Sequence, residues 1–327
     1  MKKIAGMNGF GRFGLHLLKY WLDRSSDSSF SIKYINDDTL TIEEALKIIQ
    51  NDEFVVFNKY NIKISGEKIR FLKPNGEINE LIFTNDKKDD ISWIGEPNMF
   101  FECSGKNTIK RDSSTFLVGK TETVIISATS WDADETIVFG FNHKNFDYEK
   151  KVISYGSCTV NAYVPLSNYI NDKYGIIDSD VNVIHNIQKY RLQDNYTLNR
   201  KFCTLEKSGA LLLPFINENN FVVNYTVIPY PGASIIDYRF RIRNKINLSE
   251  FYKNLKNECE EGTLKGLYNI EEQDLGPEVN NCTIFSSVFI KQGIKVMNDQ
   301  VYIFSYFDNE NSVNRYFDLV TYISNPS

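Results

Sequence analysis

No apolar run in this 327-residue sequence approaches the roughly 18–20 residues that a membrane-spanning helix needs. The N-terminus passes from Lys2 and Lys3 straight into a glycine-punctuated strand, without the apolar core of about 7–15 residues that is typical of a signal peptide. A net charge of −5 leaves no basic field for nucleic acid or an anionic membrane. We therefore expect a cytoplasmic globular protein with no nucleic-acid or membrane partner.

Cysteine and histidine are both scarce, which narrows the choice of reactive side chains. The cysteines are odd in number, widely spaced and without a CxxC pair, which argues against a disulfide framework and a zinc cluster. We expect no metal site. The cysteines are Cys103, Cys158, Cys203, Cys259 and Cys282, and the histidines are His16, His143 and His185.

The first half of the sequence alternates strand-like and helix-like segments. Thr41, with Glu44 three residues later, forms a capping box at the start of a helix. Asn75-Gly76 interrupts a period-two pattern and is a hairpin signal. These features predict an α/β domain with a doubly wound, parallel Rossmann-type sheet that carries a small antiparallel insertion.

After residue 157 the pattern changes to one helix-like stretch followed by long strand-like runs. The runs are VNVIHNIQ, FVVNYTVIPY, SIIDYRFRIR, CTIFSSVFIKQ and QVYIFSYFD. They predict an α+β domain with a mostly antiparallel sheet, and the closing NSVNRYFDLVTYIS again has helical spacing. We expect Arg239, Arg241 and Arg243 on the polar face of an antiparallel strand.

Gly9, Gly11 and Gly14 form a GxGxxG turn between the first strand and the first helix. Such glycines allow a tight turn and let the backbone approach a pyrophosphate at the helix N-terminus. Asp37 ends the second strand some 20 residues further on, where a carboxylate accepts hydrogen bonds from a ribose diol and repels a 2′-phosphate. The pattern favours NAD over NADP, and the alternative is a glycine-rich turn with Asp37 as a solvated cap.

Cys158 lies where an apolar strand gives way to a helix-compatible run, among small and polar neighbours. A helix N-terminus stabilises a thiolate, but an efficient nucleophile also needs a base. His16 and His143 are most simply surface or packing residues. His185, on the first strand of the second half, could return to Cys158 as that base, and the alternative is a core histidine on a strand.

An ordered set of segments then resembles a known family. MNGFGRFG, YINDDT, ECSG, VIISA, FGFNH, SYGSCTVNAYVPL and SYFDNE occur in the order and spacing of glyceraldehyde-3-phosphate dehydrogenase. The resemblance implies a NAD-binding domain at residues 1–157, with a C-terminal helix at about 311–327 packed back on it, and a catalytic domain at residues 158–310. It also implies a homotetramer.

The resemblance implies specific site residues. Cys158 would be the nucleophile and His185 its base, in an NAD-dependent aldehyde oxidation that proceeds through a thiohemiacetal and a thioester. Ser127 would flank the nicotinamide, and Asn309 would hydrogen-bond its carboxamide. The residues implied to hold the dinucleotide are Asn8, Gly9, Phe10, Gly11, Arg12, Phe13 and Asp37.

Departures from the family cluster on the substrate side. Gln188 and Tyr190 replace a threonine and an aspartate, Val227 replaces an arginine, and the loop between His185 and Ser208 is shortened. We hypothesise that Arg191, with Lys189 second, supplies the missing positive charge; the alternative is that these are solvated charges. The residues that retain phosphate-binding character are Ser157, Thr159, Ser208 and Gly209.

The sequence therefore predicts an NAD-dependent dehydrogenase that oxidises a small, phosphorylated aldehyde, with inorganic phosphate or water releasing the thioester. A related enzyme for a different phosphorylated or acidic aldehyde is the first alternative. A non-catalytic NAD-binding relative is the second, and retention of both Cys158 and His185 counts against it.

Overall fold

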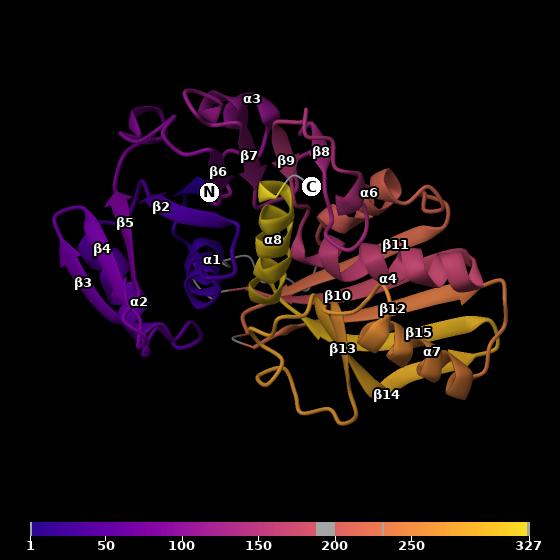
Figure 1. Cartoon of the computed structure of the whole chain (residues 1–327). Coiled ribbons are helices and arrows are strands. Elements are labelled where there is room, and N and C mark those ends of the chain that lie inside the picture. Colours follow the sequence, from indigo (N-terminus) through magenta and orange to yellow (C-terminus); the bar gives the residue numbers. More distant parts are fainter. Residues whose placement is uncertain (1, 188–199, 231, 326–327) are drawn as a thin grey trace. The chain divides into compact units, whose positions relative to one another are not determined.

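The computed structural model describes residues 2–187, 200–230 and 232–325, and it divides into two compact units (Figure 1). Unit 1 comprises Met1–Gly156 and Tyr316–Ser327, and unit 2 comprises Ser157–Arg315. Each unit contains one sheet, so the predicted α/β class with two different sheets is confirmed.

The sheet of unit 1 has the strand order β3-β4-β5-β2-β1-β6-β7-β9-β8. All pairs from β5 onward are parallel, and β3, β4 and β5 form the antiparallel insertion that the sequence predicts. Gly76 turns the chain between β4 and β5 with φ +84°, a conformation that favours glycine. The strands are β1 (Lys3–Asn8), β2 (Phe30–Asn36), β3 (Asn61–Ser65), β4 (Lys68–Leu72), β5 (Ile78–Thr84), β6 (Met99–Glu102), β7 (Thr123–Ile126), β8 (Glu135–Thr136) and β9 (Val152–Ser154).

The helices of unit 1 begin where the sequence signals place them. Thr41 caps α2, its hydroxyl accepting from the Glu44 amide while the Glu44 carboxylate accepts from the Thr41 amide, so the capping box is confirmed. Of the apolar run TIVFGFN at residues 136–142, only Thr136 belongs to a strand, the two-residue β8, and the chain turns after it. The helices are α1 (Arg12–Asp23), α2 (Ile42–Asn51) and α3 (Lys110–Ser113), with 3₁₀ segments Lys88–Asp90, Ser114–Phe116 and His143–Asn145.

The sheet of unit 2 has the order β11-β10-β12-β15-β14-β13. Its central pairs are antiparallel, as predicted, whereas the edge pairs β10–β11 and β13–β14 are parallel. The strand predicted from Cys282 begins only at Ser287. The strands are β10 (Ile176–Asn186), β11 (Phe221–Ile228), β12 (Ser234–Ile242), β13 (Tyr268–Glu271), β14 (Ser287–Met297) and β15 (Gln300–Phe307).

The helices of unit 2 include α4, which lies along its sheet in Figure 1 and is buried over most of its length. Strand β13 and helices α6 and α7 were not anticipated from the sequence. Arg239 and Arg241 pair with Asp178 and Asp180 on the neighbouring strand β10, so the assignment of these two to a polar strand face is confirmed. Arg243 follows Ile242, the last residue of β12, and is not part of the strand. The helices are α4 (Cys158–Tyr174), α6 (Thr204–Leu212), α7 (Leu248–Glu261) and α8 (Asn309–Ser324), the last continuing into unit 1.

Helix α4 contains Pro165, which has no amide hydrogen and therefore leaves the Asn161 carbonyl without its usual helical donor. The buried hydroxyl of Tyr268 lies 3.3 Å from that carbonyl oxygen and 2.9 Å from the Ala162 carbonyl oxygen. The Leu166 amide in turn donates to the Tyr268 oxygen at 3.1 Å. Tyr268 thus satisfies the interrupted ladder and ties α4 to β13.

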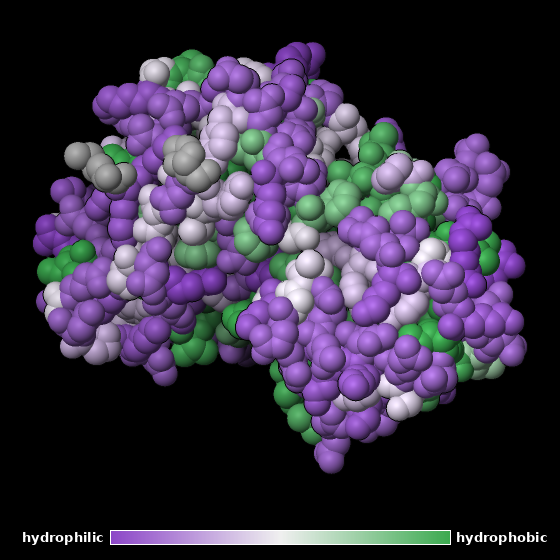
Figure 2. All heavy atoms as spheres, turned by 45° about the vertical axis from the view of Figure 1, so that its right-hand side comes forward, coloured by the Kyte–Doolittle hydropathy of each residue, from purple (hydrophilic) through white to green (hydrophobic). Residues whose placement is uncertain are grey.

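The apolar faces of both sheets are buried, and the face of the molecule in Figure 2 is mainly hydrophilic with separate hydrophobic areas. No helix within the described residues is long and apolar enough to cross a membrane.

Candidate functional site

Cys158 is the first residue of α4. Ser157 precedes it as the N-cap, its hydroxyl accepting a hydrogen bond from the Val160 amide at 3.3 Å, and Gly156 has φ +86° at the turn into the helix. Only 7% of Cys158 is exposed. The thiol therefore lies at the positive end of a 17-residue helix, where a thiolate is stabilised.

His185 lies on the buried face of β10 together with Val181 and Val183, because side chains alternate along a strand. Its Nε2 is 3.3 Å from the Sγ of Cys158. The rings of Tyr225 and Phe307 flank the imidazole, with centroids 5.9 Å and 5.6 Å away. The structure thus brings together the cysteine and the histidine that the sequence singles out.

Burial favours the neutral form of both partners. It raises the pKa of the Cys158 thiol above its ordinary value, and the nearby Cys203 adds to the rise. It lowers the pKa of His185, although a hydrogen bond to the Asn186 carbonyl opposes this shift. The pair is accordingly a thiol beside a neutral imidazole, which has a free ring nitrogen to take the thiol proton.

A group of hydroxyls surrounds the start of α4. The hydroxyls of Ser157 and Thr159 are 3.1 Å apart, and Thr204, at the start of α6, donates to the Ser157 hydroxyl at 3.2 Å. The Thr159 hydroxyl also lies 3.7 Å from the sulfur of Cys203. Thr204 was missed in the sequence because its proximity depends on how α6 packs against α4.

The other predicted anion-binding residues lie elsewhere in unit 2 or outside the described part of the chain. Ser208 and Gly209 are buried in α6, which packs against α4. Arg191, Lys189, Gln188 and Tyr190 lie outside the described residues.

Val227 lies beside the cysteine–histidine pair. It stands in register with His185 on the parallel strand β11, and Tyr225, two residues earlier on the same face, contacts the imidazole. An apolar side chain therefore occupies the position next to His185 where the family resemblance implies an arginine.

The three glycines of the turn in unit 1 have different surroundings. A Cβ on Gly9, which has φ +98°, would lie 2.4 Å from the Ser104 nitrogen, and a Cβ on Gly14 would lie 2.4 Å from the Gly9 oxygen. A Cβ on Gly11 would meet no atom within 4 Å. Gly9 and Gly14 are thus required by packing, whereas Gly11 leaves an open approach to the N-terminus of α1, where no side chain caps the helix. This arrangement fits a pyrophosphate.

A buried row of polar side chains underlies the turn. Thr84, Asn36, Asn8 and Glu102 stand in register at the carboxyl ends of β5, β2, β1 and β6. Thr84 donates to Asn36 at 2.9 Å, Asn36 to Asn8 at 3.0 Å and Asn8 to Glu102 at 2.9 Å. Burial raises the pKa of the Glu102 carboxyl. The row holds Asn8, the residue directly before the glycine turn, in one orientation.

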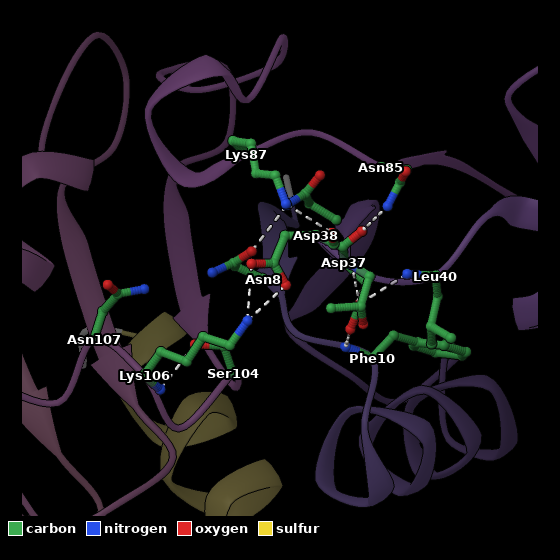
Figure 3. A network of polar contacts seen from close by, with 12 residues as sticks. Asn8, Phe10, Asp37, Asp38, Leu40, Asn85, Lys87, Ser104, Lys106 and Asn107 are labelled. Atoms are coloured by element: carbon green, nitrogen blue, oxygen red, sulfur yellow. Dashed lines mark hydrogen bonds and ion pairs between the residues drawn. The ribbon is translucent and has the colours of Figure 1, made fainter.

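Asp37 is buried, and its carboxylate accepts hydrogen bonds from main-chain amides of the glycine turn and of the loop that follows β2 (Figure 3). The Phe10 amide donates to Oδ2 at 2.8 Å, while the Thr39 and Leu40 amides donate to Oδ1 at 2.9 Å and 3.2 Å. The next residue, Asp38, is more exposed and accepts from the Lys106 ammonium at 2.8 Å through both oxygens. Asp37 therefore has a structural task in addition to the predicted ribose contact, since Oδ2 has lone-pair capacity left.

The remaining predicted cofactor residues have varied environments. The guanidinium of Arg12 contacts Asp52 and lies 3.0 Å from His16 Nε2. The ring of Phe13 packs edge-on against that of Tyr316, with the centroids 5.2 Å apart. Ser127 follows β7 in unit 1, and Asn309 is an exposed residue that begins α8 in unit 2.

His16 and His143 are both buried, as the packing alternative for these histidines predicts.

The sequence was compared with protein-family models and with curated proteins. No protein-family model matches it. "Glyceraldehyde-3-phosphate dehydrogenase 1" of Bacillus cereus is 28% identical over 345 residues, spanning 99% of each chain. The cytosolic glyceraldehyde-3-phosphate dehydrogenase of Sinapis alba is 28% identical over 346 residues, spanning 99% of this chain and 98% of its own. That of Echinococcus multilocularis is 25% identical over 340 residues, with the same coverage. The chain is therefore similar over nearly its whole length, at 25–28% identity, to proteins named glyceraldehyde-3-phosphate dehydrogenase, in line with the resemblance of its motifs.

Proposed function

We propose that the protein is an NAD-dependent aldehyde dehydrogenase of the glyceraldehyde-3-phosphate dehydrogenase type. The observation that carries the proposal is the contact of 3.3 Å between Cys158 Sγ, at the N-terminus of α4, and His185 Nε2. A thiol with a neutral imidazole at this distance can attack a carbonyl carbon while the ring takes its proton.

The chain's own residues supply each proton and charge movement. Cys158 attacks the aldehyde carbon to form a thiohemiacetal, and its main-chain amide, at the helix N-terminus, stabilises the oxyanion. His185 then accepts the proton of the thiohemiacetal hydroxyl at Nε2 as the carbon is oxidised. Bound NAD would supply the acceptor for the hydride that leaves this carbon. The product on Cys158 is a thioester, which phosphate or water releases, because a thiolate is a good leaving group.

We propose that residues 1–157 bind NAD and residues 158–310 carry the catalytic chemistry. The open side of Gly11 supports a pyrophosphate contact, and the acidic pair Asp37 and Asp38 supports NAD over NADP. We further propose Ser127 and Asn309 as nicotinamide contacts, a homotetrameric assembly and a cytoplasmic location, on the basis of the family resemblance.

The proposed substrate is a small aldehyde with an anionic group. A phosphorylated aldehyde is the first candidate, with Ser157 and Thr159 as anion contacts and Arg191 as the proposed cation. The apolar Val227 in register with His185 favours a second candidate, an aldehyde with a different anionic group.

The experiment is NADH formation with a panel of phosphorylated, carboxylated and neutral aldehydes, each with and without inorganic phosphate. Cys158→Ser should abolish turnover and leave NAD binding intact, because a serine hydroxyl is too weakly acidic for His185 to activate comparably. Cys259→Ser, in the buried part of α7, is the matched control and should turn over like the unaltered protein. Turnover by Cys158→Ser would refute the assignment, and absence of turnover with every aldehyde would favour a non-catalytic NAD-binding protein.

A further inference from the structure

We propose that Asn186 and Ser234 form a clamp that positions His185 as the base for Cys158. The inference rests on the proposed role of the cysteine–histidine pair, and it assigns two positioning residues that touch neither the thiol nor the substrate side of the imidazole.

The tautomer of His185 follows from its two ring contacts. Nδ1 lies 2.5 Å from the main-chain oxygen of Asn186, and a carbonyl oxygen can only accept a hydrogen bond. Nδ1 therefore carries the hydrogen in the neutral ring, and Nε2 presents its lone pair to Cys158 Sγ at 3.3 Å. The direction of one carbonyl group thus selects the ring form that can accept the thiol proton.

That carbonyl belongs to the last residue of β10, and side-chain bonds hold it on one side. The main-chain amide of Asn186 donates to the Ser234 hydroxyl at 3.0 Å, and the same hydroxyl donates to the side-chain oxygen of Asn186, Oδ1, at 3.0 Å. Asn186 Nδ2 donates to the Gly232 carbonyl. Ser234 is itself only 2% exposed, so the hydroxyl is fixed in a closed ring with Asn186.

The neighbouring ladder fixes the other side. The Ile187 amide donates to the Ile228 carbonyl at 2.9 Å, which holds the far end of the peptide group that contains the Asn186 carbonyl. With both ends held, this carbonyl points at Nδ1. Without the clamp, the peptide can rotate, the Nδ1 hydrogen loses its partner, and the tautomer with hydrogen on Nε2 becomes populated. That tautomer cannot accept the thiol proton.

The first measurement is the rate of Cys158 alkylation by iodoacetamide, followed at the Cys158 peptide by mass spectrometry between pH 6 and 9. Asn186→Ala should lower the rate at neutral pH about 2- to 13-fold, the equivalent of one hydrogen bond, and should displace the pH profile upward. Ser234→Ala should act in the same direction. Asn182→Ala, on the same strand and facing Asp237, is the matched control and should leave the rate unchanged.

A double-mutant cycle separates positioning from general support of the fold. In a His185→Ala background, Asn186→Ala should have no further effect on alkylation, because the base that it positions is absent. Equal losses in both backgrounds, or no loss in the unaltered background, would overturn the proposal. Alkylation needs no aldehyde or NAD, so its outcome is independent of whether the protein proves to be a dehydrogenase.

Nitrogen NMR of histidine-labelled protein supplies a second readout. With only three histidines in the chain, His185→Ala identifies the His185 signals. We expect the Nδ1-protonated form in the unaltered protein and a mixture of tautomers in Asn186→Ala. A single Nδ1-protonated form in both proteins would also overturn the proposal.

Discussion

Alanine substitutions at the three glycines of the turn should separate cofactor binding from folding. Gly11 is the N-cap of α1 with φ −74°, a conformation that alanine adopts, and its Cβ would enter open space. Gly9 has φ +98°, and a Cβ there would lie 2.4 Å from the backbone of Ser104. On Gly14 a Cβ would lie 2.4 Å from a backbone oxygen, and neither contact can be relieved by a side-chain rotation.

The expected stability changes follow from these surroundings. At Gly11, alanine reduces the conformational freedom of the unfolded chain, which stabilises the folded protein by about 0.4–1 kcal/mol. Alanine is also a poorer N-cap than glycine, which destabilises the folded protein by about the same amount. The two effects nearly cancel. At Gly14, overpacking costs about 1–3 kcal/mol, against about 1 kcal/mol gained in helix propensity. At Gly9, the left-handed backbone adds about 1–2 kcal/mol to the steric cost.

The affinity for NAD should depend most on Gly11, the position at which alanine changes stability least. If NAD binds as proposed, a Cβ at Gly11 should hold its pyrophosphate away from the helix N-terminus, and one lost hydrogen bond to a charged group is worth about 1.5–3 kcal/mol. That is a 10- to 150-fold rise in Kd, at about 1.4 kcal/mol for each factor of ten.

Calorimetric titration with NAD and thermal unfolding test the two effects separately. Gly11→Ala should bind NAD weakly at an unchanged Tm, whereas Gly9→Ala and Gly14→Ala should lower Tm, by about 2–4 °C per kcal/mol for a domain of this size. Normal NAD binding by Gly11→Ala would refute the assignment of the open side of the turn to the cofactor. An equal fall in Tm for all three variants would refute the division of roles among the glycines.

Two further predictions concern carboxylates of unit 1. Asp38→Asn should release Lys106 and improve NADP binding relative to NAD binding at an unchanged Tm. Asp37→Asn should lower both Tm and the affinity for either dinucleotide, because its carboxylate accepts main-chain hydrogen bonds. Identical behaviour of the two variants would contradict these expectations. Burial alone would raise the pKa of Asp134, but the Lys110 ammonium and two backbone amides outweigh it and lower that pKa to about 2. The ionised Asp134 carboxylate therefore stabilises the folded protein at pH values above its unfolded-state pKa near 4, and this stabilisation is lost as pH falls through about 2. Asp134→Asn should cost on the order of 1 kcal/mol of unfolding free energy at pH 7, because solvent screens the pair with the half-exposed Lys110, and much less at pH 2, as measured by urea denaturation.

The elements that were predictable from the sequence depend on local signals. The capping box of α2 and the turn at Gly76 are encoded within a few residues, and apolar periodicity gave the alternation of strands and helices. The position of Cys158 before α4 could be found in the same way. That His185 contacts Cys158, rather than lying elsewhere in the core, needed the resemblance, because nothing in the local pattern sets how β10 returns to α4.

The features that were missed depend on register between distant strands. Each of β1, β2, β5 and β6 ends in a polar residue, and that repetition was the available signal for the buried row from Thr84 to Glu102. Tyr268 could not be assigned to the break at Pro165, because β13 itself was not anticipated. A strand-end hydroxyl such as that of Ser234 likewise acquires its partner only when β12 and β10 are paired.

Val227 offers the sharpest test of which anion the substrate carries. It stands in register with His185 and on the same face as Tyr225, whose ring is 5.9 Å from the imidazole, so a longer side chain at 227 extends along the face that holds the base. Val227→Arg places a bidentate donor there, which suits phosphate geometry.

If a phosphate group lies on this face, Val227→Arg should raise kcat/KM for a phosphorylated aldehyde about 10- to 150-fold, the value of one charge-assisted contact. The unphosphorylated analogue should be unaffected, and Val227→Met, which adds length without charge, should change neither substrate. A gain confined to a carboxylated aldehyde would instead assign an acidic substrate. Equal changes on charged and neutral aldehydes would show that residue 227 acts through packing against His185 and does not contact the anion.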